Sequence, residues 1–206
     1  MKKMIWLFFI LLFLGACGTS NSNPDESNDI SSDSQASKAS ESKKSRGDGD
    51  MEKTIIVYYS LTENTKAVAE EIQKQVAGEM LRIETLEPYP IVYEDVLDRV
   101  QAQRDADELP EISKQAVDFS NYDTIFLGTP IWFGEPALPV KKWLDENDLT
   151  DKNVYPFFTS GSSSINESMA WYRSLLTHST IKEGLGITSS NKNKTSKLVE
   201  EWLDTK

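Results

Sequence analysis

The segment from residue 60 to residue 65 reads Ser-Leu-Thr-Glu-Asn-Thr and lies just before a predicted helix. Backbone N–H groups at the start of a helix are free, and the helix dipole favours an anion there. Ser60, Thr62, Asn64 and Thr65 can therefore surround a phosphate with neutral donors. The segment lacks the glycine spacing and the lysine of a P-loop, so a single phosphate monoester suits it better than a triphosphate. Helix capping by Thr62 or Asn64 is the alternative.

A second candidate segment reads Gly-Thr-Pro-Ile-Trp-Phe-Gly-Glu-Pro over residues 128–136. A Trp and a Phe at the end of a buried strand offer a flat apolar wall on which a planar ring could stack. Gly134 can adopt backbone conformations that are closed to other residues. The alternative is that Trp132 packs against the neighbouring helix as part of the core.

A third candidate segment reads Thr-Ser-Gly-Ser-Ser-Ser over residues 159–164. Small residues let the backbone approach the edge of a ligand closely. A flexible connection between a strand and a helix is the alternative interpretation of such a Ser/Gly run.

Other catalytic chemistry finds little support, because the chain has one His and one Cys. These counts exclude a multi-His metal site, a Cys cluster and an internal disulfide, and a Ser/His or Cys/His hydrolase is unsupported. His178 is interpreted as a residue near a helix end, where its charge suits the dipole. We therefore predict no catalytic side chain and no metal ligand.

The elements that must position the three segments alternate between strands and helices. Continuous apolar runs predict strands at residues 54–59, 80–83, 124–128, 154–159 and 185–187. Apolar stripes at helical spacing predict helices at residues 65–76, 92–100, 169–176 and 195–203, and another that begins near Pro139. Pro156 is tolerable only near a strand end or at a sheet edge. The alternation predicts an α/β fold with an open parallel sheet covered by helices on both faces, and a ligand site at the carboxyl ends of the strands.

The charge balance limits the class of partner. The 206 residues include 22 Lys and Arg and 33 Asp and Glu, which gives a formal net charge of −11. Nucleic acid is not expected as a partner, because its binding depends on neutralising phosphates with Lys and Arg. The length suits one domain with appendages.

The N-terminal region differs from the rest. Two lysines precede an apolar run at residues 4–13, and Leu-Gly-Ala-Cys follows at residues 14–17. This stretch resembles a bacterial lipoprotein signal, which implies cleavage after residue 16 and lipid modification of Cys17; an ordinary signal peptide is the alternative. Residues 17–52 are then the lipidated Cys and a polar, disordered tether, and residues 53–206 form the domain. We expect a protein anchored by lipid to the extracytoplasmic face of the cell membrane.

Taken together, the three segments resemble those of the flavodoxin family over nearly all of residues 53–206. Residues 56–65 are similar to its phosphate loop, residues 128–135 to its isoalloxazine loop, and residues 158–164 to its third loop. The resemblance implies a flavodoxin-like three-layer sandwich whose five-stranded parallel sheet has the order 2-1-3-4-5. It implies FMN as the cofactor.

The resemblance also implies roles for individual residues, and one departure bears on them. The residues implied to bind the phosphate are Ser60, Thr62, Asn64 and Thr65; those implied to flank the ring are Thr129, Pro130, Ile131, Trp132, Phe133 and Gly134; those implied to meet the pyrimidine edge are Ser160, Gly161 and Ser162. Glu63 stands where the family commonly has Gly. If that position requires a positive φ, Glu is strained there and places a carboxylate close to the phosphate.

These inferences predict an FMN-binding electron-transfer lipoprotein whose redox partner is a protein or a quinone. Two alternatives remain open at this point. One is a flavin-dependent reductase of quinones or small molecules, which would need a substrate cleft beside Trp132. The other is a flavodoxin-fold binding module that has lost FMN, an alternative that Glu63 supports.

Overall fold

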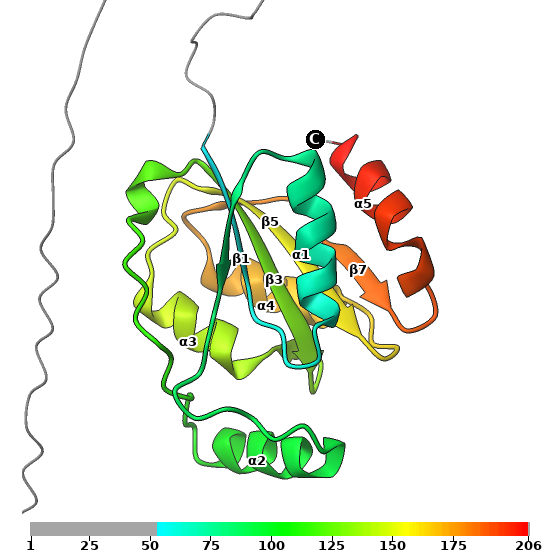
Figure 1. Ribbon diagram of the computed structural model, residues 1–206. Coiled ribbons are helices and arrows are strands. Elements are labelled where there is room, and N and C mark those ends of the chain that lie inside the picture. The colour runs from blue at the N-terminus through cyan, green and yellow to red at the C-terminus, as the bar shows by residue number, and fades with distance from the viewer. Residues whose placement is uncertain (1–52, 206) are drawn as a thin grey trace, which may run out of the picture. The chain divides into compact units, whose positions relative to one another are not determined.

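Five strands form the body of the sheet in the computed structural model, which describes residues 53–205 (Figure 1). They are β1 (Thr54–Tyr58), β2 (Glu79–Arg82), β3 (Thr124–Trp132), β5 (Asn153–Ser160) and β7 (Leu185–Thr188). The order is β2-β1-β3-β5-β7, and every neighbouring pair in it is parallel. The predicted α/β class and strand order are confirmed.

Two short strands bring the sheet to seven strands, so the predicted number of five was wrong. β4 (Glu135–Pro136) pairs antiparallel with the end of β3, and β6 (Thr180–Ile181) pairs with the start of β5. Each has only two residues, which is too short to produce an alternating pattern in the sequence.

Pro156 lies in the middle of an interior strand, where it was not expected. It pairs with Leu127 of β3 on one side. On the other side β5 pairs with β6 at Asn153 and Val154, and with β7 only from Phe157 onward. The outer ladder is therefore interrupted at Pro156, and a residue without an N–H is tolerated there as at an edge.

Helices cover both faces of the sheet, as predicted. They are α1 (Asn64–Gln75), α2 (Tyr93–Asp105), α3 (Leu138–Glu146), α4 (Asn166–Leu175) and α5 (Thr195–Leu203). Successive residues of a strand point to opposite faces. Accordingly Ile56 joins a core cluster with α1 and α5, whereas Ile55 joins the cluster that holds α2, α3 and α4.

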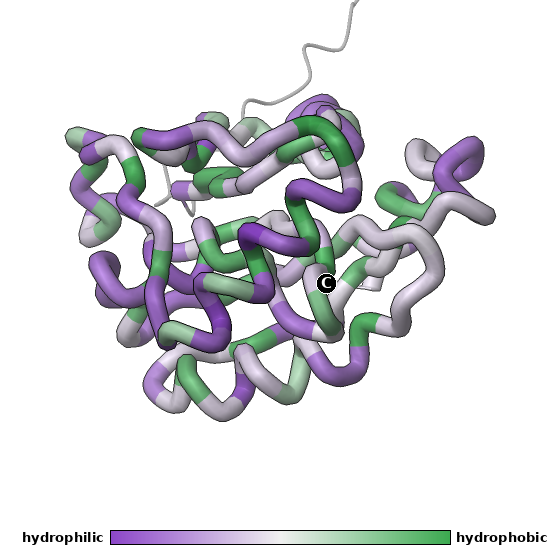
Figure 2. The backbone as a smooth tube through the Cα atoms, turned by 90° about the horizontal axis from the view of Figure 1, so that it is seen from below, coloured by the Kyte–Doolittle hydropathy of each residue, from purple (hydrophilic) through white to green (hydrophobic). Residues whose placement is uncertain are grey.

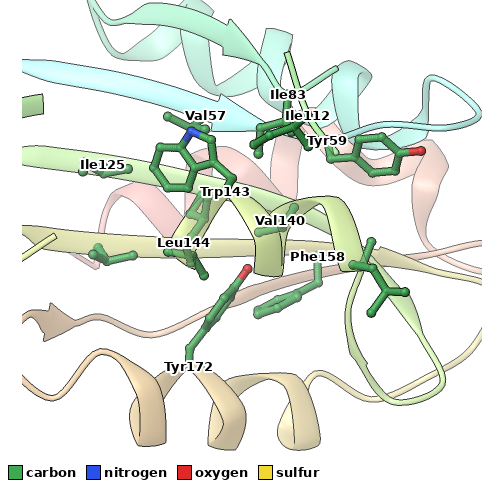
Figure 3. Packing of buried hydrophobic residues seen from close by; sticks show 14 of the residues in the cluster. Val57, Tyr59, Ile83, Ile112, Ile125, Val140, Trp143, Leu144, Phe158 and Tyr172 are labelled. Carbon is green, nitrogen blue, oxygen red and sulfur yellow. The ribbon is translucent and has the colours of Figure 1, made fainter. Parts of the chain in front are cut away.

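The cluster that holds α2, α3 and α4 is the larger of the two, and Figure 3 shows its centre. Val140, Trp143 and Leu144 project from α3 toward the sheet, and Tyr172 rises from α4 beside Phe158. Burial of these large apolar side chains is the main source of stability for this layer.

Helix α2 lies beyond the carboxyl ends of the strands (Figure 1). Its Val96 and Val100 are buried in the larger cluster. Seen from this end, hydrophilic and hydrophobic stretches alternate along the backbone (Figure 2). Within residues 53–205, no helix has the length and apolar character needed to cross a membrane.

We predict that replacing Tyr172 with Phe will leave stability unchanged or raise it by up to about 1 kcal/mol. Tyr172 is fully buried, and its hydroxyl has no hydrogen-bond partner within the part of the chain that the structure describes. Burial also raises the pKa of Tyr172, so the group stays neutral. Removing the hydroxyl therefore removes a desolvation cost and no bond. Urea unfolding of the full chain measures the change.

The matched control is Tyr89→Phe. The Tyr89 hydroxyl donates to Oε1 of Gln103 at 2.6 Å, so its loss should cost about 1 kcal/mol. An equal loss of stability in Tyr172→Phe would mean that this hydroxyl does have a partner, contrary to the prediction.

Candidate functional site

The three candidate segments start from the same edge of the sheet. Tyr58 at the end of β1 pairs with Arg82 of β2 and with Gly128 of β3. Pro130 of β3 in turn pairs with Thr159 of β5. Because all of these strands are parallel, the chain leaves each of them on the side where α2 lies (Figure 1).

The first segment forms the entry to α1. Ser60 is buried, and its Oγ accepts a hydrogen bond from the Lys66 backbone N at 3.3 Å. Thr62 and Asn64 are exposed, and Asn64 Nδ2 donates to Thr62 Oγ1 at 2.9 Å. Hydroxyl and amide groups therefore do gather at the N-terminus of a 12-residue helix.

Thr65 links the first segment to the third. Its Oγ1 lies 2.8 Å from Oγ1 of Thr159, and both side chains are buried. A bond between residues 94 positions apart in the chain shows directly that the two segments meet.

Glu63 is the N-cap of α1 and has a left-handed backbone, with φ 60° and ψ 0°. Residue 63, where the flavodoxin family commonly has Gly, therefore does adopt a positive φ. Its carboxylate makes ion pairs with Arg82 Nη1 at 2.9 Å and with Lys66 Nζ at 3.1 Å. The hydrogen bond from Lys66, and after it the one from Arg82, lowers the pKa of Glu63 below its usual value. The group is thus a carboxylate at neutral pH.

Arg82 is a site residue that the sequence analysis missed. Its Nη2 donates to the carbonyl oxygen of Ser60 at 2.8 Å, and its Nε lies 3.0 Å from Oε1 of Glu84. Residues 60–65 contain no Lys or Arg, so no cation was predicted at the phosphate end of the site. The signal was available nevertheless, because Arg82 lies next to the end of the strand predicted at residues 80–83, and adjacent parallel strands end at the same edge.

The second segment is a β-hairpin, although it was expected to be a loop. β3 continues to Trp132, and β4 pairs with it through Ile131 with Pro136 and Trp132 with Glu135. The two residues of the turn, Phe133 and Gly134, have φ values of 52° and 81°. Positive φ at both positions is the pattern of a type I′ turn, which suits the twist of a hairpin.

Thr129 has a structural role within this segment. It is fully buried, its Oγ1 donates to the Pro130 carbonyl at 2.9 Å, and the same oxygen accepts from the Ala137 backbone N at 3.0 Å. These bonds fix the base of the hairpin, so Thr129 positions the residues that follow it.

Trp132 is half-buried and held by two tyrosines. Its ring centroid lies 5.6 Å from Tyr59 and 5.0 Å from Tyr89, with interplanar angles of 84° and 61°. Burial raises the pKa of Tyr89 to about 12 and that of Tyr59 above its usual range, so both stay neutral. This aromatic cluster joins the first segment to the second and fixes the orientation of the indole.

The third segment leaves open space above its backbone. Ser160 Oγ donates to the Ser163 carbonyl at 2.9 Å, and the Ser160 carbonyl accepts from the Ser189 backbone N at 3.1 Å. Gly161 and Ser162 are exposed. A Cβ atom added to Gly161 would meet no atom within 4 Å, so a ligand can approach the backbone here.

Helix α4 holds the tip of the hairpin through residues that the sequence analysis did not single out. Ser168 is fully buried, and its Oγ donates to the Gly134 carbonyl at 2.9 Å. The carboxylate of Glu167 lies against Gly134, where an added Cβ would clash with its Oε2. No periodicity or motif marks such a contact between distant segments.

Of the predicted residues, Thr65 connects the first segment directly to the third, and Trp132 contacts Tyr59, which directly precedes the first segment. The connecting contacts are those of Thr65 with Thr159 and of Tyr59 with Trp132. Phe133 is exposed, and Pro130, Ile131 and Gly134 are half-buried along the hairpin.

Comparisons with known proteins agree with this geometry. The family model described as flavodoxin matches residues 53–206. A flavoprotein from Lactobacillus acidophilus, solved in complex with FMN, is 28% identical, with a TM-score of 0.59 over 71% of this chain and 99% of that chain. A protein from Bacteroides eggerthii that is described as a flavoprotein is 26% identical, with a TM-score of 0.66 over 74% of this chain and 96% of its own. No match is found among curated proteins.

We predict that Ser168→Ala will destabilise the domain by about 1–2 kcal/mol, because it leaves the Gly134 carbonyl without its buried donor. Hydrogen exchange of residues 131–136 should also become faster, because α4 no longer holds the hairpin.

Ser174→Ala is the control on the same helix. Ser174 Oγ donates to the Trp171 carbonyl at 2.7 Å and is exposed, so its removal should change stability by less than about 0.5 kcal/mol. Equal effects of the two substitutions would contradict a specific role for Ser168.

Proposed function

This chain belongs to the flavodoxin family, and on that premise we propose that residues 53–206 bind FMN and transfer electrons. The observation that supports this most is the convergence of three segments at one edge of the sheet, joined by the contacts of Thr65 with Thr159 and of Tyr59 with Trp132. The Lactobacillus acidophilus flavoprotein, which is 28% identical to this chain and was solved in complex with FMN, adds support.

The residues present fit the parts of FMN in a consistent order. Ser60, Thr62, Asn64 and Thr65 would bind the phosphate at the N-terminus of α1, where free N–H groups favour an anion. Trp132 would stack beside the ring in the orientation that its two tyrosines set. The open backbone at residues 160–162 would meet the pyrimidine edge.

FMN supplies one- and two-electron transfer when it is bound, and the protein supplies position and electrostatics. The formal net charge of −11 disfavours further negative charge in the site and therefore favours low reduction potentials. The neutral cluster of Tyr59, Tyr89 and Trp132 contributes an apolar wall without a titrating group near neutral pH.

The proposed location rests on the sequence of residues 1–52, which lie outside the described residues. We propose that Cys17 carries the lipid anchor after removal of residues 1–16, and that residues 17–52 tether the domain to the extracytoplasmic face of the membrane. The electron donor or acceptor would be a protein or a quinone, and nucleic acid is not a partner.

A flavin-dependent reductase is the second candidate, and one observation favours it. A cavity of about 660 Å³ lies between α2, α3 and α4, with Glu135, Lys141 and Trp171 among its lining residues. Arg104, which also lines it, places its guanidinium 4.9 Å from the centre of the Phe133 ring at the hairpin tip. A small substrate could bind here at the tip of the hairpin, although Trp132, beside which such a cleft was expected, does not line this cavity. Steady turnover with a nicotinamide or quinol donor would favour this candidate over an electron carrier.

We predict that the full chain, solubilised in detergent and incubated with FMN, will leave a desalting column yellow. Trp132→Ala should then weaken FMN binding about tenfold, because a lost stacking contact costs about 0.5–1.5 kcal/mol beyond burial. Flavin fluorescence titration measures the dissociation constant.

Two further variants distinguish the loss of the stacking contact from a general loss of structure. Trp132→Phe keeps a flat ring and should retain most of the affinity. Trp171→Ala removes an indole that lies outside the three segments and should leave the affinity unchanged. A colourless wild-type protein with an intact circular dichroism spectrum would instead favour the binding module without FMN.

We predict that Cys17→Ser will move the protein from the membrane fraction to the soluble fraction of the producing bacterium, because the lipid attachment site is gone. Fractionation and immunoblotting measure this, with Ser20→Ala as a control in the adjacent tether. Retention of Cys17→Ser in the membrane fraction would contradict the lipid anchor.

A further inference from the structure

An acidic side chain stands at the point where the proposed site would receive a phosphate. Glu63 occupies the N-cap position of the helix whose N-terminus would bind that phosphate, and it is ionised at neutral pH. A phosphate monoester carries about −1.5 to −2 charges at pH 7, so Glu63 should oppose it. The surrounding residues have to reduce this repulsion if FMN is to bind tightly.

Two cations hold the Glu63 carboxylate, one on each of its oxygens. Arg82 Nη1 lies 2.9 Å from Oε1, and Lys66 Nζ lies 3.1 Å from Oε2. Both cations are shared with other carboxylates: Arg82 with Glu84 at 3.0 Å, and Lys66 with Glu70 at 3.8 Å. Three acids thus surround two bases, and the cluster has a net charge of −1.

Arg82 differs from Lys66 in how firmly it is placed. Its guanidinium also donates to the Ser60 carbonyl at 2.8 Å, and its side chain is 31% exposed against 39% for Lys66. A planar guanidinium with several donors fixes a carboxylate better than a single ammonium does. Arg82 therefore holds one oxygen of the Glu63 carboxylate on the β2 side of the first segment, while Lys66 holds the other.

We propose that Arg82 is a positioning residue that lets this site accept a phosphorylated flavin. It neutralises Glu63 and holds its carboxylate toward β2, so that the N-terminus of α1 can still bind the phosphate dianion of FMN. Glu63 in turn limits the affinity for the phosphate and has no effect on the ring. The inference rests on the proposed binding of FMN and deepens it, because it assigns part of the discrimination between FMN and riboflavin to the ion pair of Glu63, in the first segment, with Arg82, which lies outside the three segments.

The test compares FMN with riboflavin, which has the same ring but no phosphate. Arg82→Gln in the full chain should weaken FMN binding about tenfold and leave riboflavin binding within about twofold. Glu63→Gln should strengthen FMN binding about threefold or more, again without effect on riboflavin. Arg82→Lys keeps the charge but only part of the geometry, so its FMN affinity should lie between wild type and Arg82→Gln.

The double variant shows whether Arg82 acts through Glu63. In the Glu63→Gln background, Arg82→Gln should cost clearly less FMN affinity than it does in wild type. An equal fold-loss in both backgrounds would overturn the proposal, because Arg82 would then act independently of Glu63. An equal loss of riboflavin affinity would overturn it too, since Arg82 would then only support the fold through the Ser60 carbonyl.

Lys74→Gln is the matched control. Lys74 pairs with Glu71 at the i,i+3 spacing that Lys66 and Glu63 also have, but near the opposite end of α1. Its loss should therefore leave the affinities for FMN and riboflavin unchanged. Thermal unfolding of each variant without flavin shows whether the fold is intact, and Glu63→Gln tests the proposal even if Arg82→Gln does not fold. A wild-type chain that binds no FMN would refute the proposed function itself, whereas FMN binding that Arg82→Gln leaves unchanged would refute this inference alone.

Discussion

Parallel pairing of β1 with β2 and β3, and of β3 with β5, is the constraint on which the site depends. It brings the carboxyl ends of four strands to one edge, so segments nearly 100 residues apart become neighbours. The pairing of Tyr58 with Arg82 and with Gly128 places the start of the first segment beside a cation and beside the base of the hairpin. A shift of one residue in this register would exchange the faces of β1 and move Ile55 and Ile56 into each other's core clusters, so the packing of both faces also fixes the site.

The geometry of the first segment is imposed by packing more than by its own ion pairs. A non-glycine residue in the left-handed region costs about 1–2 kcal/mol. Exposed ion pairs contribute about 0.2–1 kcal/mol each, so those of Glu63 with Arg82 and Lys66 together contribute about 0.4–2 kcal/mol, which does not exceed that cost. Buried Val68 and Ile72 hold α1 against the sheet, and the Ala67 N–H still bonds to the Glu63 carbonyl at 3.0 Å. The strain at residue 63 is therefore maintained by the core.

The sequence predicted those features that depend on local pattern. Apolar runs identified the five main strands and helical stripes identified the five helices, whereas a positive φ at Glu63 was raised only as a condition, from the Gly that the flavodoxin family commonly has at this position. It did not predict β4, because Phe at the first turn position is not a typical hairpin signal. It also missed Arg82 and Ser168, since each meets the site through a tertiary contact that only the register and the packing of α4 determine. The sequence singled out Trp132 itself but not its neighbours Tyr59 and Tyr89, which are distant from it in sequence.

Each of the three segments is bound to another part of the site before any ligand arrives. Thr65 bonds to Thr159, Trp132 packs on Tyr59 and Tyr89, and Ser168 holds Gly134. Ordering a rotamer-rich side chain on binding costs about 0.5–1.5 kcal/mol, and a site already ordered by its own contacts avoids much of that cost. The exposed backbone at Gly161 is the part without such a restraint from side-chain packing. Adjustment to a bound ring is therefore expected at the third segment first, while the hairpin and the entry to α1 keep their positions.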